Sequence, residues 1–327
     1  MASGAYPFGL DQGTNMSYLI TGGTGFIGAH IARFLAQAGE KVIIYDIEPR
    51  RDVLEYLMSK EEIVLVEVVK GDITDLAHLI RTAKEHNCTK IIHMAALLSN
   101  ASSANPVLAV RVNCGGTVNI LEAARILNLE KVVYASSNAV FGLAEQHKEE
   151  YVSNDAPHYP STLYGACKSF DERLARHYFN EYGLDSVGLR FPVVYGLGHK
   201  EGAAATLTEE LMVKPALGKP SRVPCGDDSV NWLYVEDAAR GAVMASKTSR
   251  TKTRSYNIGG EFCPIAVAAD YVRKLVPGAD ITLLPGHTGF TGKFEISKIR
   301  EDIGYYPQWS LELGTEQVIN AVRKLHN

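Results

Sequence analysis

Short apolar runs alternate with longer amphipathic stretches through the first 190 residues of this chain, and this alternation restricts the fold more than any other feature. The apolar runs have the length of buried strands, and the stretches between them repeat their apolar residues at helical spacing. Strands separated by helices form parallel sheets through right-handed crossovers. We therefore predict an α/β fold with a Rossmann-type, doubly wound parallel sheet. The predicted strands are residues 17–20, 41–45, 62–69, 90–94, 131–134 and 186–190, and the predicted helices are residues 26–38, 75–86, 105–127 and 161–182.

The regular spacing weakens after Gly196, where glycine and proline become frequent. Helical spacing returns at residues 237–245 and 264–275. A chain of 327 residues exceeds what one hydrophobic core usually serves, so one large or two unequal domains are expected. We interpret the chain as a flexible tail at residues 1–16, a sheet domain at residues 17–196 and a smaller lobe at residues 197–327, with some segments that return to the sheet.

Composition excludes several classes of protein. Basic and acidic side chains are nearly balanced, 33 against 37, so nucleic acid is not expected as a partner. The longest apolar run, residues 91–98, is far shorter than the roughly 20 residues that span a bilayer, so no membrane association is expected. Glu85, His86 and Cys88 have no second ligand cluster, so no metal site is predicted.

The cysteines and the N-terminus bear on location. Five cysteines without paired spacing indicate reduced thiols rather than a disulfide framework. No Lys or Arg precedes Arg33, so the charged region of a signal peptide is lacking. We therefore expect a cytoplasmic protein.

A glycine-rich turn, TGGTGFIG at residues 21–28, follows the first predicted strand and opens the first predicted helix. Gly22 permits a tight turn, Gly25 lets the backbone approach a pyrophosphate, and Gly28 lets the helix pack close to the sheet. The start of the helix supplies free N–H groups and a positive dipole for phosphates. A glycine turn without a ligand is the alternative, but the strand before it and the helix after it favour a dinucleotide site.

Asp46 ends the second predicted strand, at the position where an acid accepts hydrogen bonds from the ribose hydroxyls of the cofactor. A carboxylate there repels a 2′-phosphate, which favours NAD over NADP. Arg50 and Arg51 follow closely and are able to accommodate a phosphate, so NADP stays open as an alternative. Asp46 as a solvated loop acid is the other alternative.

Asp72 follows the third predicted strand and is a candidate to accept a hydrogen bond from the adenine amino group. The alternative is that Asp72 caps the next helix. Thr74 or Asp75 would serve better as that cap, which favours the adenine contact.

Tyr164 and Lys168 lie four residues apart near the start of a predicted helix, so they share one face of it. A phenol is a poor base at neutral pH, but a neighbouring ammonium favours the phenolate and lowers the pKa. Such a tyrosine takes the proton of an alcohol as hydride leaves its carbon. Tyrosine and lysine at this spacing also occur by chance on helix surfaces.

Two serines at the end of the fifth predicted strand strengthen this interpretation. Ser136 and Ser137 lie at the carboxyl edge of the sheet, where ligands bind in open parallel sheets. A serine hydroxyl there is able to donate a hydrogen bond to the substrate oxygen. The alternative is that both serines only satisfy the strand end.

Together these motifs resemble the extended short-chain dehydrogenase/reductase family, also called the NAD-dependent epimerase/dehydratase family. They occur in the family's order and cover about residues 17–195. The matching positions are residues 21–28, Asp46, residues 71–72, residues 93–96, Asn113, Ser137, Tyr164 and Lys168, followed later by residues 232–237 and 256–260.

The resemblance implies an NAD-dependent enzyme that acts on a small molecule and forms a homodimer through its two long helices. Ser137, Tyr164 and Lys168 would be catalytic, with Asn113 supporting Lys168 directly or through water. The cofactor-binding residues would be Gly22, Gly25, Phe26, Ile27, Gly28, Asp46, Asp72, Ile73, Ala95, Ala96, Tyr164, Lys168, Pro192 and Val194. The residues that contact the substrate would be Ser99, Ser137, Asn138 and Trp232.

Departures from the family pattern narrow the substrate. The family's dehydratases carry an Asp-Glu pair after the catalytic hydroxyl residue, where this chain has Asn138 and Ala139, so elimination of water is not expected. Nucleotide-sugar members usually carry Asn and Arg at the positions of Val193 and Val230. The loss of both polar groups argues against a diphosphate-linked sugar.

Residues 95–99, 105–106 and 188–192 instead resemble short-chain L-threonine dehydrogenases, which act on a free, small hydroxy compound. We therefore predict an NAD-dependent oxidoreductase for a secondary alcohol or ketone of a hydroxy acid, amino alcohol or sugar acid, and residues 197–327 would select the substrate. The alternative is a sugar epimerase that oxidises its substrate transiently. A non-catalytic NAD-binding protein is a third hypothesis, against which the intact Ser, Tyr and Lys set argues.

Overall fold

The main sheet is parallel and seven-stranded, in the order β10-β6-β5-β4-β1-β2-β3. The computed structural model describes residues 17–289 and 292–326, so the tail predicted at residues 1–16 lies outside the described residues. The strand order reverses beside β1, because the chain builds outward through β2 and β3 and then returns to β4 on the other side. Such a reversal places ligand sites at the carboxyl ends of the neighbouring strands. The strands are β1 (Ser17–Thr21), β2 (Lys41–Asp46), β3 (Val66–Lys70), β4 (Cys88–His93), β5 (Lys131–Ser137), β6 (Ser186–Phe191) and β10 (Ser255–Asn257).

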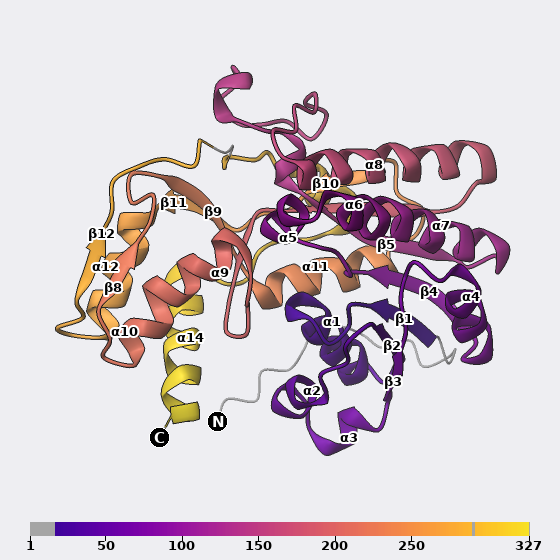
Figure 1. The fold of residues 1–327 in the computed structure, drawn as a ribbon, viewed down its shortest axis with the longest axis horizontal. Coiled ribbons are helices and arrows are strands. Elements are labelled where there is room, and N and C mark those ends of the chain that lie inside the picture. Colours follow the sequence, from indigo (N-terminus) through magenta and orange to yellow (C-terminus); the bar gives the residue numbers. More distant parts are fainter. Residues whose placement is uncertain (1–16, 290–291, 327) are drawn as a thin grey trace.

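Helices cover both faces of this sheet (Figure 1). Successive strand residues point to opposite faces, so Leu19 and Ile20 of β1 belong to two different buried cores. The prediction of a doubly wound α/β fold is therefore confirmed. One face carries α1 (Phe26–Gln37), α2 (Arg51–Leu57), α3 (Lys60–Ile63) and α11 (Val235–Lys247), and the other carries α4 (Leu76–Glu85), α7 (Gly116–Ile126) and α8 (Leu163–Tyr182).

The predicted strand at residues 62–69 is wrong at its start, since β3 begins only at Val66. Glu62 belongs to α3, where Ser59 accepts a hydrogen bond from the Glu62 N–H and the Glu62 carboxylate accepts one from the Ser59 N–H. This reciprocal cap fixes a helical turn in a segment whose apolar residues suggested a strand. The helix α2 was also not predicted.

The long helix predicted at residues 105–127 contains a π-helical segment. It begins as α6 (Pro106–Ala109), widens at Val110–Gly115 and continues as α7. A short helix, α5 (Ser99–Ala104), precedes it. Single π-helical turns inside α-helices are frequent at functional sites.

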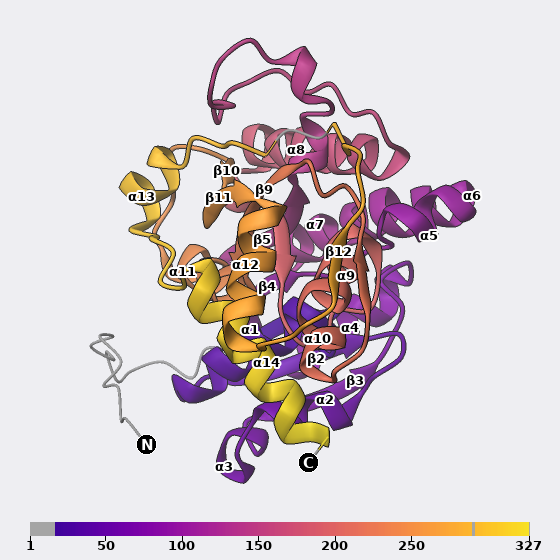
Figure 2. The ribbon, with the colours of Figure 1, turned by 90° about the vertical axis from the view of Figure 1, so that its left-hand side faces the viewer.

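The second half of the chain builds a smaller lobe, seen face-on in Figure 2. This lobe has its own buried core, which includes Trp232. Three segments of this half pack with the main sheet instead, because β10 pairs with β6, α11 packs on α1 and α13 (Ser297–Ile303) packs on β10. The boundary at residue 196 therefore stays a prediction. The remaining elements are β7 (Val193–Tyr195), α9 (Gly202–Thr208), a π-helical turn (Glu209–Val213), α10 (Lys214–Ala216), β8 (Ser221–Val223), β9 (Ser229–Tyr234), β11 (Glu261–Pro264), α12 (Ile265–Leu275), β12 (Ile281–Leu283) and α14 (Leu311–His326).

Two searches of the described residues bear on ligands and membranes. None of the described helices combines the length and the apolar character needed to cross a bilayer. Within residues 17–289 and 292–326, no three His, Cys, Asp or Glu side chains are grouped so that they could hold a metal ion.

Candidate active site

A cavity of about 960 Å³ lies at the carboxyl edge of the main sheet, where the sheet meets the second lobe. The glycine turn, the end of β2, the ends of β5 and β6, and the start of α8 line one side of it. Residues of α9, β9 and the segment after β7 line the other side. The cavity therefore occupies the place where ligands bind in doubly wound sheets.

The glycine turn has the geometry that a pyrophosphate requires. Gly22 adopts a φ of +66°, which favours glycine. A Cβ atom on Gly28 would lie 2.2 Å from the Gly22 carbonyl oxygen, so only glycine fits there. Within the described residues no side chain caps α1, and Phe26 and Ile27 line the cavity at its start. The first N–H groups of α1 are thus available to phosphates, and the turn fits a dinucleotide.

Asp46 is held at the edge of the cavity by the glycine turn. Its Oδ2 accepts hydrogen bonds from the Thr24 N–H at 3.1 Å and the Thr24 hydroxyl at 2.7 Å. Carboxylate oxygens have further lone pairs, so Asp46 is still able to accept hydrogen bonds from ribose hydroxyls. Among the described residues, Arg50 is the one cation near Asp46 that lines the cavity. Its guanidinium donates to the Asp52 carboxylate at 2.8 Å, which offsets the Arg50 charge.

Asp72 does not cap α4, because Asp75 does so by accepting a hydrogen bond from the His78 N–H at 3.0 Å. Asp72 accepts from the Thr74 N–H at 2.8 Å, and the Ile73 side chain is buried in the core beneath α7. Neither residue lines the cavity, so their predicted contacts with the cofactor stay predictions.

Ala95 and Ala96 follow β4 on the other side of the glycine turn. A Cβ on Gly22 would lie 2.8 Å from the Ala95 nitrogen, so this segment and the turn are in close contact. Ala96 lines the cavity, as do Ser99, Pro192 and Val194. The structure therefore brings these four predicted residues to one site.

Tyr164 lies in the first turn of α8, and Thr162 fixes this start by accepting a hydrogen bond from the Gly165 N–H at 3.0 Å. The Tyr164 side chain lines the cavity. The Lys168 ammonium lies 5.8 Å from the centre of the Tyr164 ring and is 2% exposed. The structure therefore places a buried ammonium next to the Tyr164 ring.

Asp171 pairs with Lys168, with Oδ2 at 3.4 Å from Nζ. Burial disfavours the Lys168 charge, but the attraction of Asp171 and Tyr164 outweighs it, so the lysine pKa is raised. Burial also raises the pKa of the fully buried Asp171 carboxyl to about 6, although the Lys168 charge opposes this shift. Asp171 was not predicted, although its position three residues after Lys168 places it on the same helix face.

The two serines at the end of β5 differ in their partners. The Ser136 hydroxyl donates to the buried Glu172 carboxylate at 2.5 Å, so its proton is committed. The Ser137 hydroxyl accepts from the Ala139 N–H at 3.1 Å and donates to the Asn138 side chain at 3.3 Å. Both Ser137 and Asn138 line the cavity beside Tyr164. Ser137 is the serine whose hydrogen can turn to a ligand, because its present acceptor is a neutral amide.

Asn113 lies in the π-helical segment, and its side chain bonds the α5 region rather than Lys168. Its Oδ1 accepts from the Leu97 N–H at 2.8 Å, and its Nδ2 donates to the Leu97 carbonyl at 2.9 Å and the Ser102 hydroxyl at 3.4 Å. No hydrogen bond joins Asn113 to Lys168 within the described residues, and the predicted support of Lys168 by Asn113, directly or through water, stays a prediction.

The structure corrects the predicted role of Trp232 in substrate binding. The indole is 1% exposed, packs edge-on against Tyr195 and donates to the Cys263 carbonyl at 3.3 Å. It fills the core of the second lobe and does not line the cavity, so the predicted substrate contact is wrong. Its neighbour Asn231 lines the cavity instead.

Sequence reasoning missed most of what the second lobe contributes. The segment at residues 196–202 lies over the glycine turn, and the His199 imidazole stacks on Phe26 with ring centres 4.5 Å apart. Gly196, Gly198 and Gly202 all adopt positive φ there. These closely spaced glycines were a signal for a loop with left-handed backbone turns, although they did not indicate which segment the loop would lie against.

The comparisons with known proteins point to one family. The sequence matches the NAD dependent epimerase/dehydratase family over residues 18–259. UDP-glucuronate 4-epimerase 3 of Arabidopsis thaliana is 29% identical over 328 residues, which cover 92% of this chain and 75% of that protein.

Solved structures match over nearly the whole chain. The UDP-glucose 4-epimerase of Thermus thermophilus, in complex with NAD, superposes with a TM-score of 0.81 at 26% identity, over 94% of this chain and 99% of that chain. A partial consensus L-threonine 3-dehydrogenase superposes with a TM-score of 0.84 at 24% identity, over 94% of this chain and 99% of that one. The second likeness shows a shared fold.

Proposed function

This chain belongs to the NAD-dependent epimerase/dehydratase family and is an NAD-dependent enzyme of the extended short-chain dehydrogenase/reductase type, and from that premise we propose its reaction. We propose net hydride transfer between NAD and the secondary alcohol, or the ketone, of a small polar substrate. The substrate class is a hydroxy acid, an amino alcohol or a sugar acid.

The observation that carries this proposal is the low positive charge on the substrate side of the cavity. Among the described residues of the second lobe that line it, Lys200 is the one charged basic side chain, and Glu201 beside it offsets that charge. Burial lowers the pKa of His199, so this imidazole is neutral. Val193 and Val230 also line the cavity, where nucleotide-sugar enzymes of the family would have polar groups. A diphosphate prefers arginine forks, which this side lacks.

Tyr164 is the proposed acid–base residue. Its hydroxyl would take the proton of the substrate alcohol, or return one to the ketone, with the Lys168 charge favouring the phenolate. Ser137 would hold the substrate oxygen by a hydrogen bond, since the Ala139 N–H fixes its hydroxyl beside the cavity. NAD supplies the hydride acceptor when it is bound.

The residues proposed to hold the cofactor surround the same cavity. The glycine turn and the start of α1 would bind the pyrophosphate, and Asp46 the adenosine ribose. Pro192 and Val194 would lie beside the nicotinamide, and Lys168 would hold its ribose. The contact between Thr24 and Asp46 supports this assignment, because it couples the turn to the ribose acid.

A sugar epimerase is the second candidate, and one observation favours it. The curated relative that is 29% identical is a UDP-glucuronate 4-epimerase, and it covers 92% of this chain. In such a reaction the same residues would hold a carbinol and move its proton, while NAD, when bound, would accept its hydride and return it to the opposite face of the ketone. The cofactor would then show no net change.

Net formation of NADH separates the two candidates. We expect a screen of free hydroxy acids, amino alcohols, polyols and nucleotide sugars with added NAD to give NADH absorbance at 340 nm with one of the free compounds. Conversion of UDP-glucuronate to its 4-epimer with no net NADH would contradict the proposal and establish the epimerase. Net NADH from nucleotide sugars alone would overturn the interpretation of Val193 and Val230.

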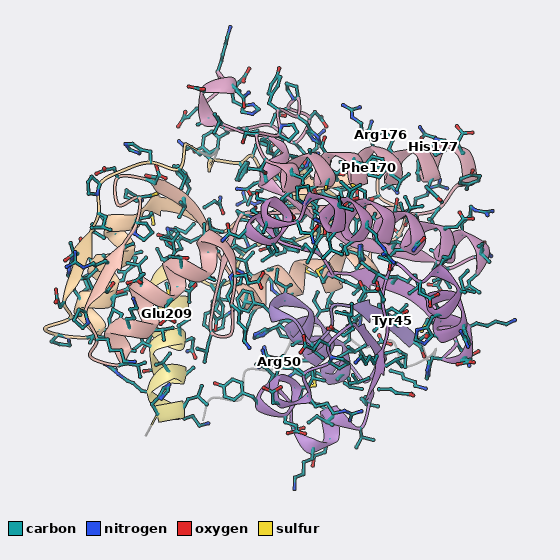
Figure 3. The ribbon with its side chains drawn as sticks, in the orientation of Figure 1. Tyr45, Arg50, Phe170, Arg176, His177 and Glu209 are labelled. Atoms are coloured by element: carbon teal, nitrogen blue, oxygen red, sulfur yellow. The ribbon has the colours of Figure 1, made fainter. Side chains whose placement is uncertain are left out.

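We also propose a homodimer. Support comes from exposed apolar side chains on α6, the π-helical segment, α7 and α8, namely Val107, Val110, Ile126 and Phe170. Phe170 of α8 is labelled in Figure 3. Large apolar side chains left exposed on neighbouring helices favour a protein contact.

Sedimentation velocity tests the dimer. We expect the wild-type chain to sediment as a dimer and Phe170→Asp as a monomer, because the substitution places a charge in the apolar contact. Leu313→Asp is the matched control, since Leu313 is also an exposed apolar residue on a helix but lies on α14. A wild-type monomer at micromolar concentration would contradict the proposal.

A cytoplasmic location is proposed as well. All five cysteines are free thiols in the structure, which is typical of proteins in a reducing compartment.

A further inference from the structure

A second cleft, of about 430 Å³, lies beside α8 and apart from the active-site cavity. It is lined by residues 154–158, by Glu172, Arg173 and Arg176 of α8, by Arg190 of β6 and by residues near the start of β10. Tyr178, toward the other side of α8, bonds Glu122 of α7. The cleft therefore lies on the side of α8 away from α7.

The floor of the cleft is a buried and fully paired ion pair. Arg190 donates to Glu172 through Nε at 2.8 Å and Nη2 at 2.7 Å, and through Nη1 to the Asn154 carbonyl at 2.7 Å. Glu172 also accepts from Ser136, which lines the active-site cavity. Ser136, Glu172 and Arg190 thus separate the second cleft from the active-site cavity, and the charges of Glu172 and Arg190 cancel.

The rim of the cleft carries an uncompensated positive charge. Arg173 and Arg176 are exposed, and neither makes an ion pair or hydrogen bond with any residue of the described ranges. The acid on the rim, Asp155, is already paired with Lys298. Two guanidinium groups one helical turn apart thus face a concave space whose other charges are neutralised.

A histidine completes the cleft. His158 Nδ1 lies 2.8 Å from the Ser169 hydroxyl, and Nε2 lies 3.5 Å from Arg190 Nη2 and 3.6 Å from the Glu172 carboxylate. Burial lowers the pKa of His158, and the surrounding arginines lower it further against the opposing effect of Glu172. A negative ligand would favour the imidazolium, so His158 is a built-in reporter of an anion in the cleft.

We propose that this cleft is a binding site for a small oxyanion of the phosphate or carboxylate class, held by Arg173 and Arg176. Guanidinium groups present paired N–H donors that match the oxygens of both ligand classes. The volume admits a small anion and its hydration, and the rim provides a net charge opposite to that of the ligand. The site is separate from the cofactor and substrate residues, so the proposal does not depend on the proposed reaction.

Calorimetric titration of the full chain with inorganic phosphate, and separately with malonate, tests the site. Saturating NAD is kept present, because free phosphate would otherwise bind the glycine turn, and the ionic strength is held constant. We expect saturable binding of at least one probe to the wild type. In Arg173→Gln/Arg176→Gln the affinity should fall by about tenfold or more, as expected for the loss of charged hydrogen bonds. The tighter of the two probes identifies the ligand class.

The matched control is Arg81→Gln/Lys84→Gln, which removes two exposed basic side chains at the same spacing from α4. This variant should bind like the wild type. Imidazole NMR gives an independent measurement, in which the bound anion raises the pKa of His158 in the wild type but not in the Arg173/Arg176 variant. Equal affinity in both double variants, or no saturable binding of either probe, would overturn the proposal.

Discussion

Tyr164→Phe should lower kcat/KM by about two to four orders of magnitude, the usual contribution of general acid–base catalysis. The phenyl ring keeps its place at the start of α8, but the proton acceptor beside Ser137 is lost. Because the glycine turn and Asp46 are untouched, NAD should bind with unchanged affinity. Steady-state kinetics on the substrate found in the screen, together with NAD binding by fluorescence, measure the two effects separately.

Tyr182→Phe is the control for this substitution. Tyr182 ends the same helix, is 54% exposed, and loses the same hydroxyl outside the cavity. We expect its kcat/KM to equal that of the wild type. Full activity of Tyr164→Phe would remove Tyr164 from the mechanism. Loss of NAD binding along with activity would instead mean that the hydroxyl serves the cofactor.

The local parts of the site could be predicted from the sequence because their geometry depends on neighbouring residues. The turn at Gly22, Gly25 and Gly28 follows from steric limits on one strand, one turn and one helix. The spacing of Tyr164 and Lys168 likewise needs only the period of a helix. These residues all line or adjoin the cavity in the structure.

The rest depends on contacts between distant segments, which spacing does not encode. Glu172 meets Ser136 and Arg190 because β5 and β6 pair in a register that places these two strand residues side by side. Trp232 follows Asn231, which lines the cavity. The pairing of β7 with β9, however, points the Trp232 side chain into the core of the second lobe. The predicted start of β3 was wrong because the Ser59 cap fixes a helical turn at residues where the apolar pattern suggested a strand.

The Lys168 and Asp171 pair gives a second large effect, on stability as well as activity. Lys168→Met removes the ammonium that compensates the fully buried Asp171 carboxylate, and breaking such a pair costs about 3–5 kcal/mol in the free energy of unfolding. It also removes the charge beside the Tyr164 ring, so activity should fall together with stability.

The pH dependence of this loss identifies its cause. Burial already raises the pKa of Asp171 to about 6 in the folded chain, against about 4 when unfolded, and the loss of Lys168 raises it further. A carboxyl with a raised pKa stabilises the fold while it is protonated, and that stability is lost as pH rises through the folded pKa. In urea denaturation, Lys168→Met should therefore lie close to the wild type near pH 5 and fall well below it at pH 8.

The double variant Lys168→Met/Asp171→Asn separates stability from catalysis. An amide at position 171 has no charge to bury, so the free energy of unfolding at pH 8 should recover and its extra pH dependence should disappear. Activity should not recover, because the ammonium beside Tyr164 is still missing. If Lys168→Met is as stable as the wild type at pH 8, the pair does not contribute to the fold. If the double variant regains activity, Lys168 acts only by neutralising Asp171, and its proposed effect on Tyr164 is wrong.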